Sequence, residues 1–150
     1  MPLGKRQAAF VSVGYTGRDM LTIIAGSRVT DQYTALVGIH SCPWRGKITV
    51  VLSGCNKIKH PNGIITGMDY WGEEWAKAQG IPIERYPYLS QYGRAGGPIR
   101  NSRMAKAADA AIIIWDGRST GSADMLKKAE ARGLLLHVRT FAELVGEILG

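Results

Sequence analysis

Five short apolar runs, separated by segments with helical periodicity, constrain the fold more than any other feature of this chain. The runs are LTIIAGS (21–27), ITVVLSG (48–54), IPIERYP (81–87), DAAIIIWD (109–116) and LLLHVRT (134–140). Most of them are continuous stretches rich in β-branched residues, which is typical of strands buried on both faces. We therefore predict an α/β fold, namely a Rossmann-like three-layer domain with a five-stranded, mainly parallel sheet.

Helix signals fill the intervals between these runs. The expected first caps or first residues of the helices are Thr30 or Asp31, Asp69, Pro98 and Ser122. Gly80 and Gly133 are expected to end two of the helices, and the segment 141–149 is expected to form the last one. The alternation of strand and helix predicts right-handed crossovers between parallel strands.

Length and composition narrow the function classes. The 150 residues fit a single domain at 20–150, preceded by an N-terminal extension or arm at 1–19. No apolar run reaches the roughly 20 residues of a membrane span, so we expect no membrane partner. Two cysteines, Cys42 and Cys55, provide no disulfide framework and favour a cytoplasmic location. The net charge of +7 leaves three interpretations open, namely nucleic acid, an anionic small molecule or solubility alone.

Small polar residues and glycines follow the first, second and fourth predicted strands. In open parallel sheets, ligands bind at the carboxyl ends of strands, where the strand order reverses. We expect the first and fourth strands to be neighbours, which would bring their loops together. The predicted ligand-binding residues in these loops are Gly26, Ser27, Arg28, Ser53, Gly54, Gly67, Asp116, Gly117, Ser119, Gly121 and Ser122.

Two arginines near a predicted helix start suggest a bound anion. The positive end of a helix disfavours cations, and Arg100 and Arg103 stand close to the expected start at Pro98. A phosphate at this place would remove the conflict, so we predict that Arg100 and the adjacent Asn101 contact the ligand. Arg103 is explained as well by a solvated helix face.

Asp69 has two interpretations that are compatible with each other. It can cap the helix that follows, and its carboxylate can accept hydrogen bonds from ribose hydroxyls. Asp69 and Arg100 are also the candidate catalytic residues if the protein is an enzyme. Tyr88 and Tyr92 lie in a loop before this helix and could stack on a base or pack within the loop.

We expect no metal ion and no cofactor. Cys42 and Cys55 flank a predicted seven-residue strand, which separates them by about 20 Å. Zinc ligands have to converge within a few ångström, so these residues cannot share a site. No P-loop is present, and His137 lies inside the fifth predicted strand, where it cannot serve a Ser-His-Asp arrangement.

Four pieces of the chain, in this order and spacing, resemble the SLOG superfamily of Rossmann-like proteins, in particular its small single-domain branch in bacteria and phages. The pieces are IIAGSR, SG…TGMDYWGEEWAKAQGI, GPIRNSRMAKAADAAIIIWDG and STGSADMLKKA before GLLLHV, and they span about residues 20–140. The resemblance implies a nucleotide-type ligand at the carboxyl edge of the sheet. SLOG members include ligand sensors, binders of single-stranded DNA and the Lonely Guy phosphoribohydrolases.

The resemblance to the Lonely Guy enzymes is partial. Arg100 in PIRNSRM falls on their catalytic arginine, and Gly117 and Gly121 match two glycines of their P-G-G-x-G-T-x-x-E motif. Met125 stands where that motif has its catalytic glutamate. Asp116, Arg118 and Ser122 replace a proline, a glycine and the threonine of the motif. Ligand binding therefore carries over better than hydrolysis.

Three functions stay open at this point. The first is binding or sensing of a phosphorylated nucleoside or nucleotide-derived molecule. The second is an N-glycosidic-bond hydrolase or transferase acting on nucleotides. The third is a module that binds single-stranded nucleic acid, for which the chain lacks a contiguous basic stripe. Whether the chain pairs with a second copy of itself is equally open.

Overall fold

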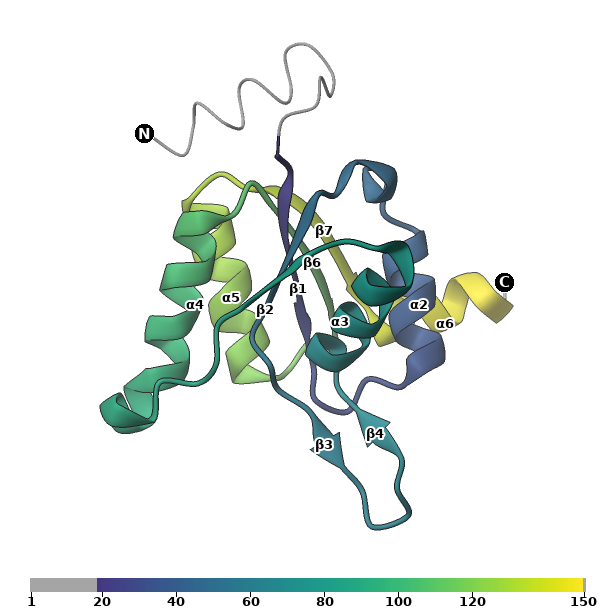
Figure 1. Ribbon diagram of the computed structural model, residues 1–150. Helices are drawn as coiled ribbons and strands as arrows, with labels where there is room; N and C mark the ends of the chain where they lie inside the picture. The colour runs from purple at the N-terminus through teal and green to yellow at the C-terminus, as the bar shows by residue number, and fades with distance from the viewer. Residues whose placement is uncertain (1–18, 150) are drawn as a thin grey trace.

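The computed structural model describes residues 19–149, so the predicted arm at 1–19 lies outside the described part except for Asp19. Five strands form one parallel sheet in the order β5-β2-β1-β6-β7 (Figure 1). Their bounds are β1 Leu21–Gly26, β2 Val50–Ser53, β5 Ile83–Arg85, β6 Ala110–Trp115 and β7 Leu135–Thr140. The predicted fold class is confirmed, and the first and fourth predicted strands, β1 and β6, are neighbours.

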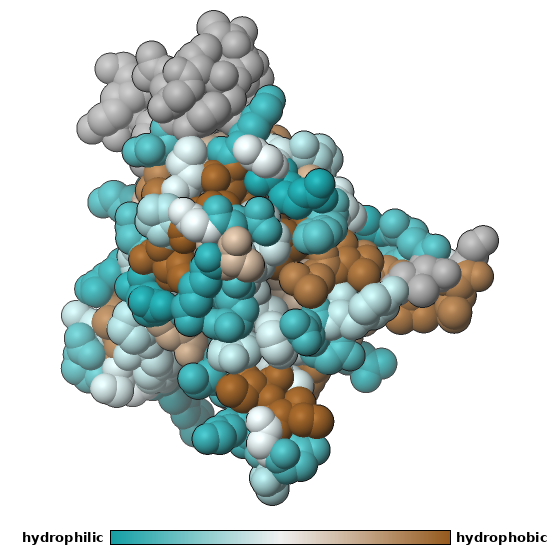
Figure 2. All heavy atoms as spheres, turned by 45° about the vertical axis from the view of Figure 1, so that its right-hand side comes forward, coloured by the Kyte–Doolittle hydropathy of each residue, from teal (hydrophilic) through white to brown (hydrophobic). Residues whose placement is uncertain are grey.

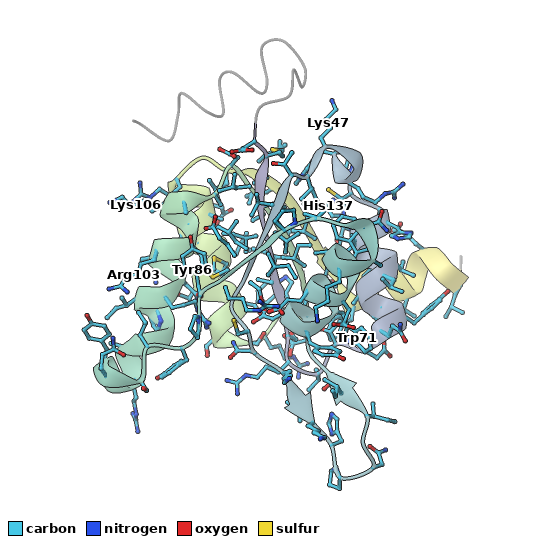
Figure 3. All side chains as sticks on the ribbon, viewed as in Figure 1. Lys47, Trp71, Tyr86, Arg103, Lys106 and His137 are labelled. Carbon is cyan, nitrogen blue, oxygen red and sulfur yellow. The ribbon has the colours of Figure 1, made fainter. Side chains whose placement is uncertain are left out.

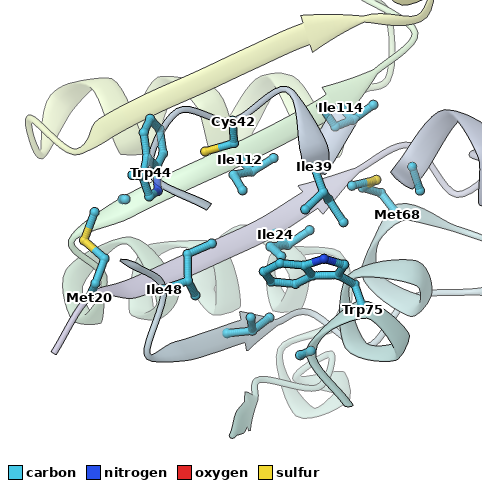
Figure 4. Packing of buried hydrophobic residues seen from close by; sticks show 14 of the residues in the cluster. Met20, Ile24, Ile39, Cys42, Trp44, Ile48, Met68, Trp75, Ile112 and Ile114 are labelled. Atoms are coloured by element: carbon cyan, nitrogen blue, oxygen red, sulfur yellow. The ribbon is translucent and has the colours of Figure 1, made fainter. Parts of the chain in front are cut away.

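Helices cover both faces of the sheet. One face packs against α2 (Gln32–His40), α3 (Met68–Gln79) and α6 (Phe141–Leu149), and the other packs against α4 (Gly96–Ala107) and α5 (Thr120–Ala131) (Figure 1). The first layer buries Ile24, Ile39, Trp75 and Leu144 (Figure 4 shows most of this cluster). The two central strands β1 and β6 are buried along almost their whole length, whereas β7 is half-buried and the edge strand β5 is largely exposed.

β1 and β6 approach each other closely at their carboxyl ends. A Cβ atom on Gly26 would lie 1.8 Å from the carbonyl oxygen of Ile114, so no side chain fits at this position. The amide of Ser27, the next residue, donates to the same carbonyl oxygen at 3.3 Å. The chain order reverses between these two strands, which is where a Rossmann-like sheet binds its ligands.

Two short 3₁₀ helices and a hairpin complete the described chain. They are η1 (Arg45–Lys47), η2 (Ser90–Ala95), and β3 (Ile58–Lys59) with β4 (Ile65–Thr66). No strand was predicted for the segment that forms the hairpin, because two-residue strands are too short to show a hydrophobic period. The hairpin projects from the carboxyl end of the sheet (Figure 1).

Three predicted helix starts are wrong, whereas Asp31 is confirmed as the cap of α2, since its Oδ1 accepts from the Thr34 amide at 2.8 Å. α3 begins at Met68 after its N-cap Gly67, and Asp69 lies in the first turn, where its carboxylate accepts from the amide of Asn56. α4 begins at Gly96, two residues before Pro98. α5 begins at Thr120 after Ser119, and Ser122 is its third residue.

The surface is mixed in character. In the view of Figure 2, apolar side chains gather near α6, where Val145 and Leu149 are exposed, and near the β3–β4 hairpin, where Ile64 is exposed. No helix within residues 19–149 has the length and apolar character that crossing a bilayer would require.

Candidate functional site

A cavity of about 560 Å³ opens at the carboxyl ends of β1 and β6. Its walls come from the loop after β1, from α4, and from the loop and first turn that lead into α5. Pockets for small ligands have volumes of roughly 300–1,000 Å³, so the size suits an organic ligand. The pocket lies where the strand order reverses, as the sequence analysis expected.

Most of the predicted ligand-binding residues line this pocket. They are Gly26, Ser27, Arg28, Gly54, Asp69, Arg100, Asn101, Asp116, Ser119, Gly121 and Ser122. Three predicted residues are not in the lining. Ser53 is fully buried and its hydroxyl donates to Glu73 at 2.6 Å, Gly67 caps α3, and Gly117 makes the turn before α5 with a φ of 81°.

The first turn of α5 faces the pocket with its amides open. A helix leaves its first N–H groups without partners inside the helix, and here these belong to Thr120, Gly121 and Ser122. The N-cap residue Ser119 makes no side-chain capping bond. Its hydroxyl instead donates to Ser122 Oγ at 3.1 Å and lies 3.2 Å from Ser27 Oγ. Open amides at a helix start form an anion site.

Gly121 has no structural reason to be a glycine. A Cβ atom at this position would meet nothing within 4 Å, although glycine weakens a helix by up to about 1 kcal/mol relative to alanine. Gly121 is one of the residues that line the pocket. A ligand that approaches the backbone here would explain the residue.

Asp116 shapes the loop between β6 and α5. Its Oδ1 accepts from the amides of Arg118 and Ser119, both at 2.9 Å, and these bonds lower the pKa of the exposed carboxyl. The amide of Asp116 donates to Ser27 Oγ at 3.1 Å, so the two loops are tied together across the β1–β6 boundary. Asp116 thus fixes the backbone that presents the α5 amides.

Arg100 is buried, with 6% of its surface exposed, and reaches from α4 to the opposite loops. Its Nη1 donates to the carbonyl oxygens of Gly54 (2.6 Å) and Tyr86 (3.1 Å), and its Nε donates to Asn101 Oδ1 (3.0 Å). Its Nη2 has no partner within residues 19–149 and remains for a ligand. The guanidinium is therefore fixed in place before any ligand arrives.

Contrary to what the sequence had indicated, Arg100 and Arg103 do not lie at the positive end of their helix. Because α4 begins at Gly96, Arg100 is its fifth residue and Arg103 its eighth, beyond the turn where the helix dipole acts. Arg103 is exposed and points away from the sheet (Figure 3), in agreement with a solvated face. The case for Arg100 now rests on its position in the pocket.

Asn101 links α4 to α5. Its Nδ2 donates to Asp124 Oδ2 at 3.0 Å, and Lys128 Nζ lies 2.7 Å from the same oxygen. Lys128 also donates to the carbonyl oxygen of Pro98 at 2.8 Å. These bonds fix the amide orientation of Asn101, whose Oδ1 then accepts from Arg100. Asp124, which lines the pocket, is neutralised by Lys128 and adds little repulsion toward an anion.

Asp69 is the buried acid of the pocket, with 6% of its surface exposed. Its Oδ2 accepts from the amide of Asn56 at 2.9 Å, while Oδ1 has no partner in the described chain. Burial raises the pKa of this carboxyl to about 6, although the Asn56 amide and the charge of Arg100 lower it in part. Its carboxylate can therefore accept hydrogen bonds from a ligand.

Asp69 and Arg100 meet around Gly54. A Cβ atom on Gly54 would lie 2.8 Å from Arg100 Nη1 and 2.9 Å from Asp69 Oδ2, so the glycine makes room for both groups. Behind them, Glu73 is held by Ser53 and forms an ion pair with Arg85 at 2.9 Å. Glu73 is engaged there and is not in the pocket lining.

The mouth of the pocket includes residues that the sequence analysis left open or missed. Tyr88 and Arg94 line it, whereas Tyr92 does not. Asn56, Val29, Gly97, Pro98, Met104, Thr120, Asp124 and Met125 complete much of the remaining lining. Asn56 could have been predicted as a lining residue, because it lies in the loop that follows a buried strand. No cluster of three potential metal ligands occurs within residues 19–149.

The fold and the pocket together define a Rossmann-like α/β protein with a cavity at the strand-order reversal. Comparisons of the chain with protein-family models, with curated proteins and with solved structures find no match. The function therefore has to be argued from the chemistry of the pocket.

Proposed function

We propose that this protein binds a phosphorylated nucleoside or a related nucleotide-derived ligand at the carboxyl edge of its sheet. One observation carries the proposal, namely that the uncapped first turn of α5 lines the same cavity as Arg100, whose Nη2 has no partner within residues 19–149. Backbone amides at a helix start and a guanidinium are the donors that bind phosphate in proteins. The exposed Arg28 adds a positive charge to the same wall.

The neighbouring groups suit a sugar. Asp69 Oδ1 is free to accept from ribose hydroxyls, and Asn56 holds the carboxylate in position through its amide. The open space at Gly121 allows the ligand to reach the backbone. These features support the resemblance to the SLOG superfamily, and membership of that superfamily is part of the proposal.

Isothermal titration with adenosine 5′-monophosphate (AMP) and adenosine tests the proposal. AMP should bind at least tenfold more tightly than adenosine, because only AMP carries the phosphate. Arg100→Lys should weaken AMP binding by about tenfold, since lysine lacks the forked donors of arginine. Arg103→Lys is the matched control on the outer face of the same helix and should leave the affinity unchanged. Equal affinities for AMP and adenosine, or equal effects of the two variants, would contradict the proposal.

A second candidate function is cleavage of the N-glycosidic bond of the ligand. The observation in its favour is that burial brings the pKa of Asp69 to about 6, close to the working range of a general base. Asp69 would accept a proton from the water that attacks the anomeric carbon. The base would leave with the electrons of the broken bond and be protonated. Met125 occupies the place of the Lonely Guy glutamate, which speaks against that family's mechanism.

Base release distinguishes binding from catalysis. The protein is incubated with AMP, and free adenine is measured by chromatography. Release that disappears in Asp69→Asn while AMP still binds would establish the enzyme. Binding without any release, at protein concentrations near that of AMP, would leave the binding function alone.

A further inference from the structure

Tyr88 is held firmly at the mouth of the pocket. A Cβ atom on Gly96 would lie 2.2 Å from the Leu89 carbonyl oxygen and 3.0 Å from Cε1 of the Tyr88 ring. A Cβ atom on Gly97 would lie 3.5 Å from Cε2 of the same ring. The Tyr88 hydroxyl donates to the carbonyl oxygen of Gly93. Two glycines at the start of α4 thus allow the ring to pack directly on the backbone.

The same ring is 48% exposed and lines the cavity. An aromatic ring that is fixed on one side and open on the other loses little freedom when a flat group packs on it. Arg94 lies in the same wall, is exposed, and has no partner within residues 19–149. Its guanidinium can donate to acceptor atoms on the edge of a heteroaromatic ring.

The cavity extends beyond what a phosphate needs. Its lining includes the first turn of α5, Asp69 and Arg100, and also Tyr88 and Arg94 from the segment before α4. The volume of about 560 Å³ accommodates an organic ligand of nucleotide size. The anion donors and the aromatic ring line one cavity, so a ligand with both a charged group and a planar group can use both.

We infer that Tyr88 stacks on the base of the ligand and that the site selects complete nucleotides over sugar phosphates. This inference rests on the proposed function, because it takes the α5 amides and Arg100 as the phosphate site. It adds the recognition of the base, with Tyr88 as the stacking surface and Arg94 as the donor to the ring edge.

Tyr92 provides a matched control. It lies in the same segment and is 46% exposed, close to the 48% of Tyr88, but it is not part of the pocket lining. Tyr88→Leu and Tyr92→Leu therefore remove the same side chain with nearly the same exposure. Only the first variant removes it from the cavity.

The experiment measures the affinities of AMP and ribose 5-phosphate by isothermal titration for the wild type and both variants. The wild type should prefer AMP by about tenfold or more, the range of one aromatic stacking contact. Tyr88→Leu should abolish most of that preference and leave the ribose 5-phosphate affinity unchanged. Tyr92→Leu should keep the preference. Arg94→Gln changes an exposed side chain that has no partner among the described residues, and it should reduce the preference for AMP several-fold. This variant also tests the recognition of the base if Tyr88→Leu fails to fold.

The outcomes separate this inference from the function on which it rests. If AMP and ribose 5-phosphate bind the wild type equally, the base is not recognised and the inference is overturned, while phosphate binding stands. If the preference survives in folded Tyr88→Leu, or in Arg94→Gln where Tyr88→Leu does not fold, the inference is overturned as well. If neither compound binds the wild type, the proposed function fails together with it.

Discussion

Replacing Asp69 with asparagine should stabilise the protein at neutral pH. The carboxyl is buried, and its pKa rises from 3.8 to about 6 in the folded chain. Roughly two pKa units correspond to about 3 kcal/mol of differential interaction between the protonation states. Asparagine is neutral at every pH and its side-chain oxygen can still accept from the Asn56 amide. The variant thus mimics the protonated acid and escapes the cost of the buried charge.

The sign of the pH dependence follows from proton binding. Between pH 3.8 and about 6 the folded state binds more protons at Asp69 than the unfolded state, so stability falls as the pH rises. The stabilising contribution is fully present below pH 3.8 and is lost as the pH passes through about 6. The free energy of unfolding of Asp69→Asn minus that of the wild type should be near zero at pH 3.5 and approach about 3 kcal/mol at pH 7.5.

Urea unfolding of both proteins at several pH values provides the measurement, because the contributions of titrating groups that do not interact with Asp69 cancel in the difference. A difference that stays constant with pH would refute the reasoning, and so would one that grows as the pH falls. If the stabilised variant also binds AMP more weakly, the protein keeps a costly charge for its ligand, as functional sites often do.

Two glycine substitutions test the site and the sheet. Gly121→Glu should preserve the free energy of unfolding or raise it by up to about 1 kcal/mol, since a better helix former and an acid enter the first turn of α5. The same variant should abolish AMP binding, because its carboxylate occupies the anion site. Urea unfolding measures the first effect and titration with AMP the second, and retained AMP binding would contradict the site. Gly26→Ala should lower the free energy of unfolding by about 3 kcal/mol or more, because its Cβ would lie 1.8 Å from the Ile114 carbonyl oxygen. Gly46→Ala, with nothing within 4 Å of its Cβ, is the control, and equal urea midpoints for these two variants would show that β1 and β6 separate more easily than the structure implies.

The sequence predicted the sheet well because its signal is local. Runs such as AAIIIW (110–115) are short, apolar at every position and rich in β-branched residues, which is typical of a strand covered on both faces. The prediction that β1 and β6 are adjacent followed from the general rules of open α/β sheets. The hairpin of β3 and β4 escaped prediction because each strand has two residues.

The candidate site was predictable in its location but not in its bonds. Asp69 was expected as a helix cap, yet its carboxylate bonds to the amide of Asn56, 13 residues earlier, a partner that no local pattern reveals. Arg100 donates to backbone carbonyl oxygens of Gly54 and Tyr86. Every residue has such an oxygen, so the residue types do not reveal which one accepts. The residue types thus predicted which loops lie side by side. Which atoms form hydrogen bonds is determined by the tertiary fold.

The pocket lies across the boundary between β1 and β6, and this has a consequence for how the chain acquires its binding ability. The two strands join residues as far apart as Leu21 and Asp109, whose bond spans 88 positions. Pairings of that span form against a large loop entropy and tend to slow folding. Since the β1 loop and the α5 turn become neighbours only through this pairing, a fragment that ends before β6 lacks the whole wall formed by Asp116 and the first turns of α5 and should not bind. A ligand in the pocket holds the two halves of the chain together, and at one hundred times its dissociation constant it would add about 2.7 kcal/mol to their association.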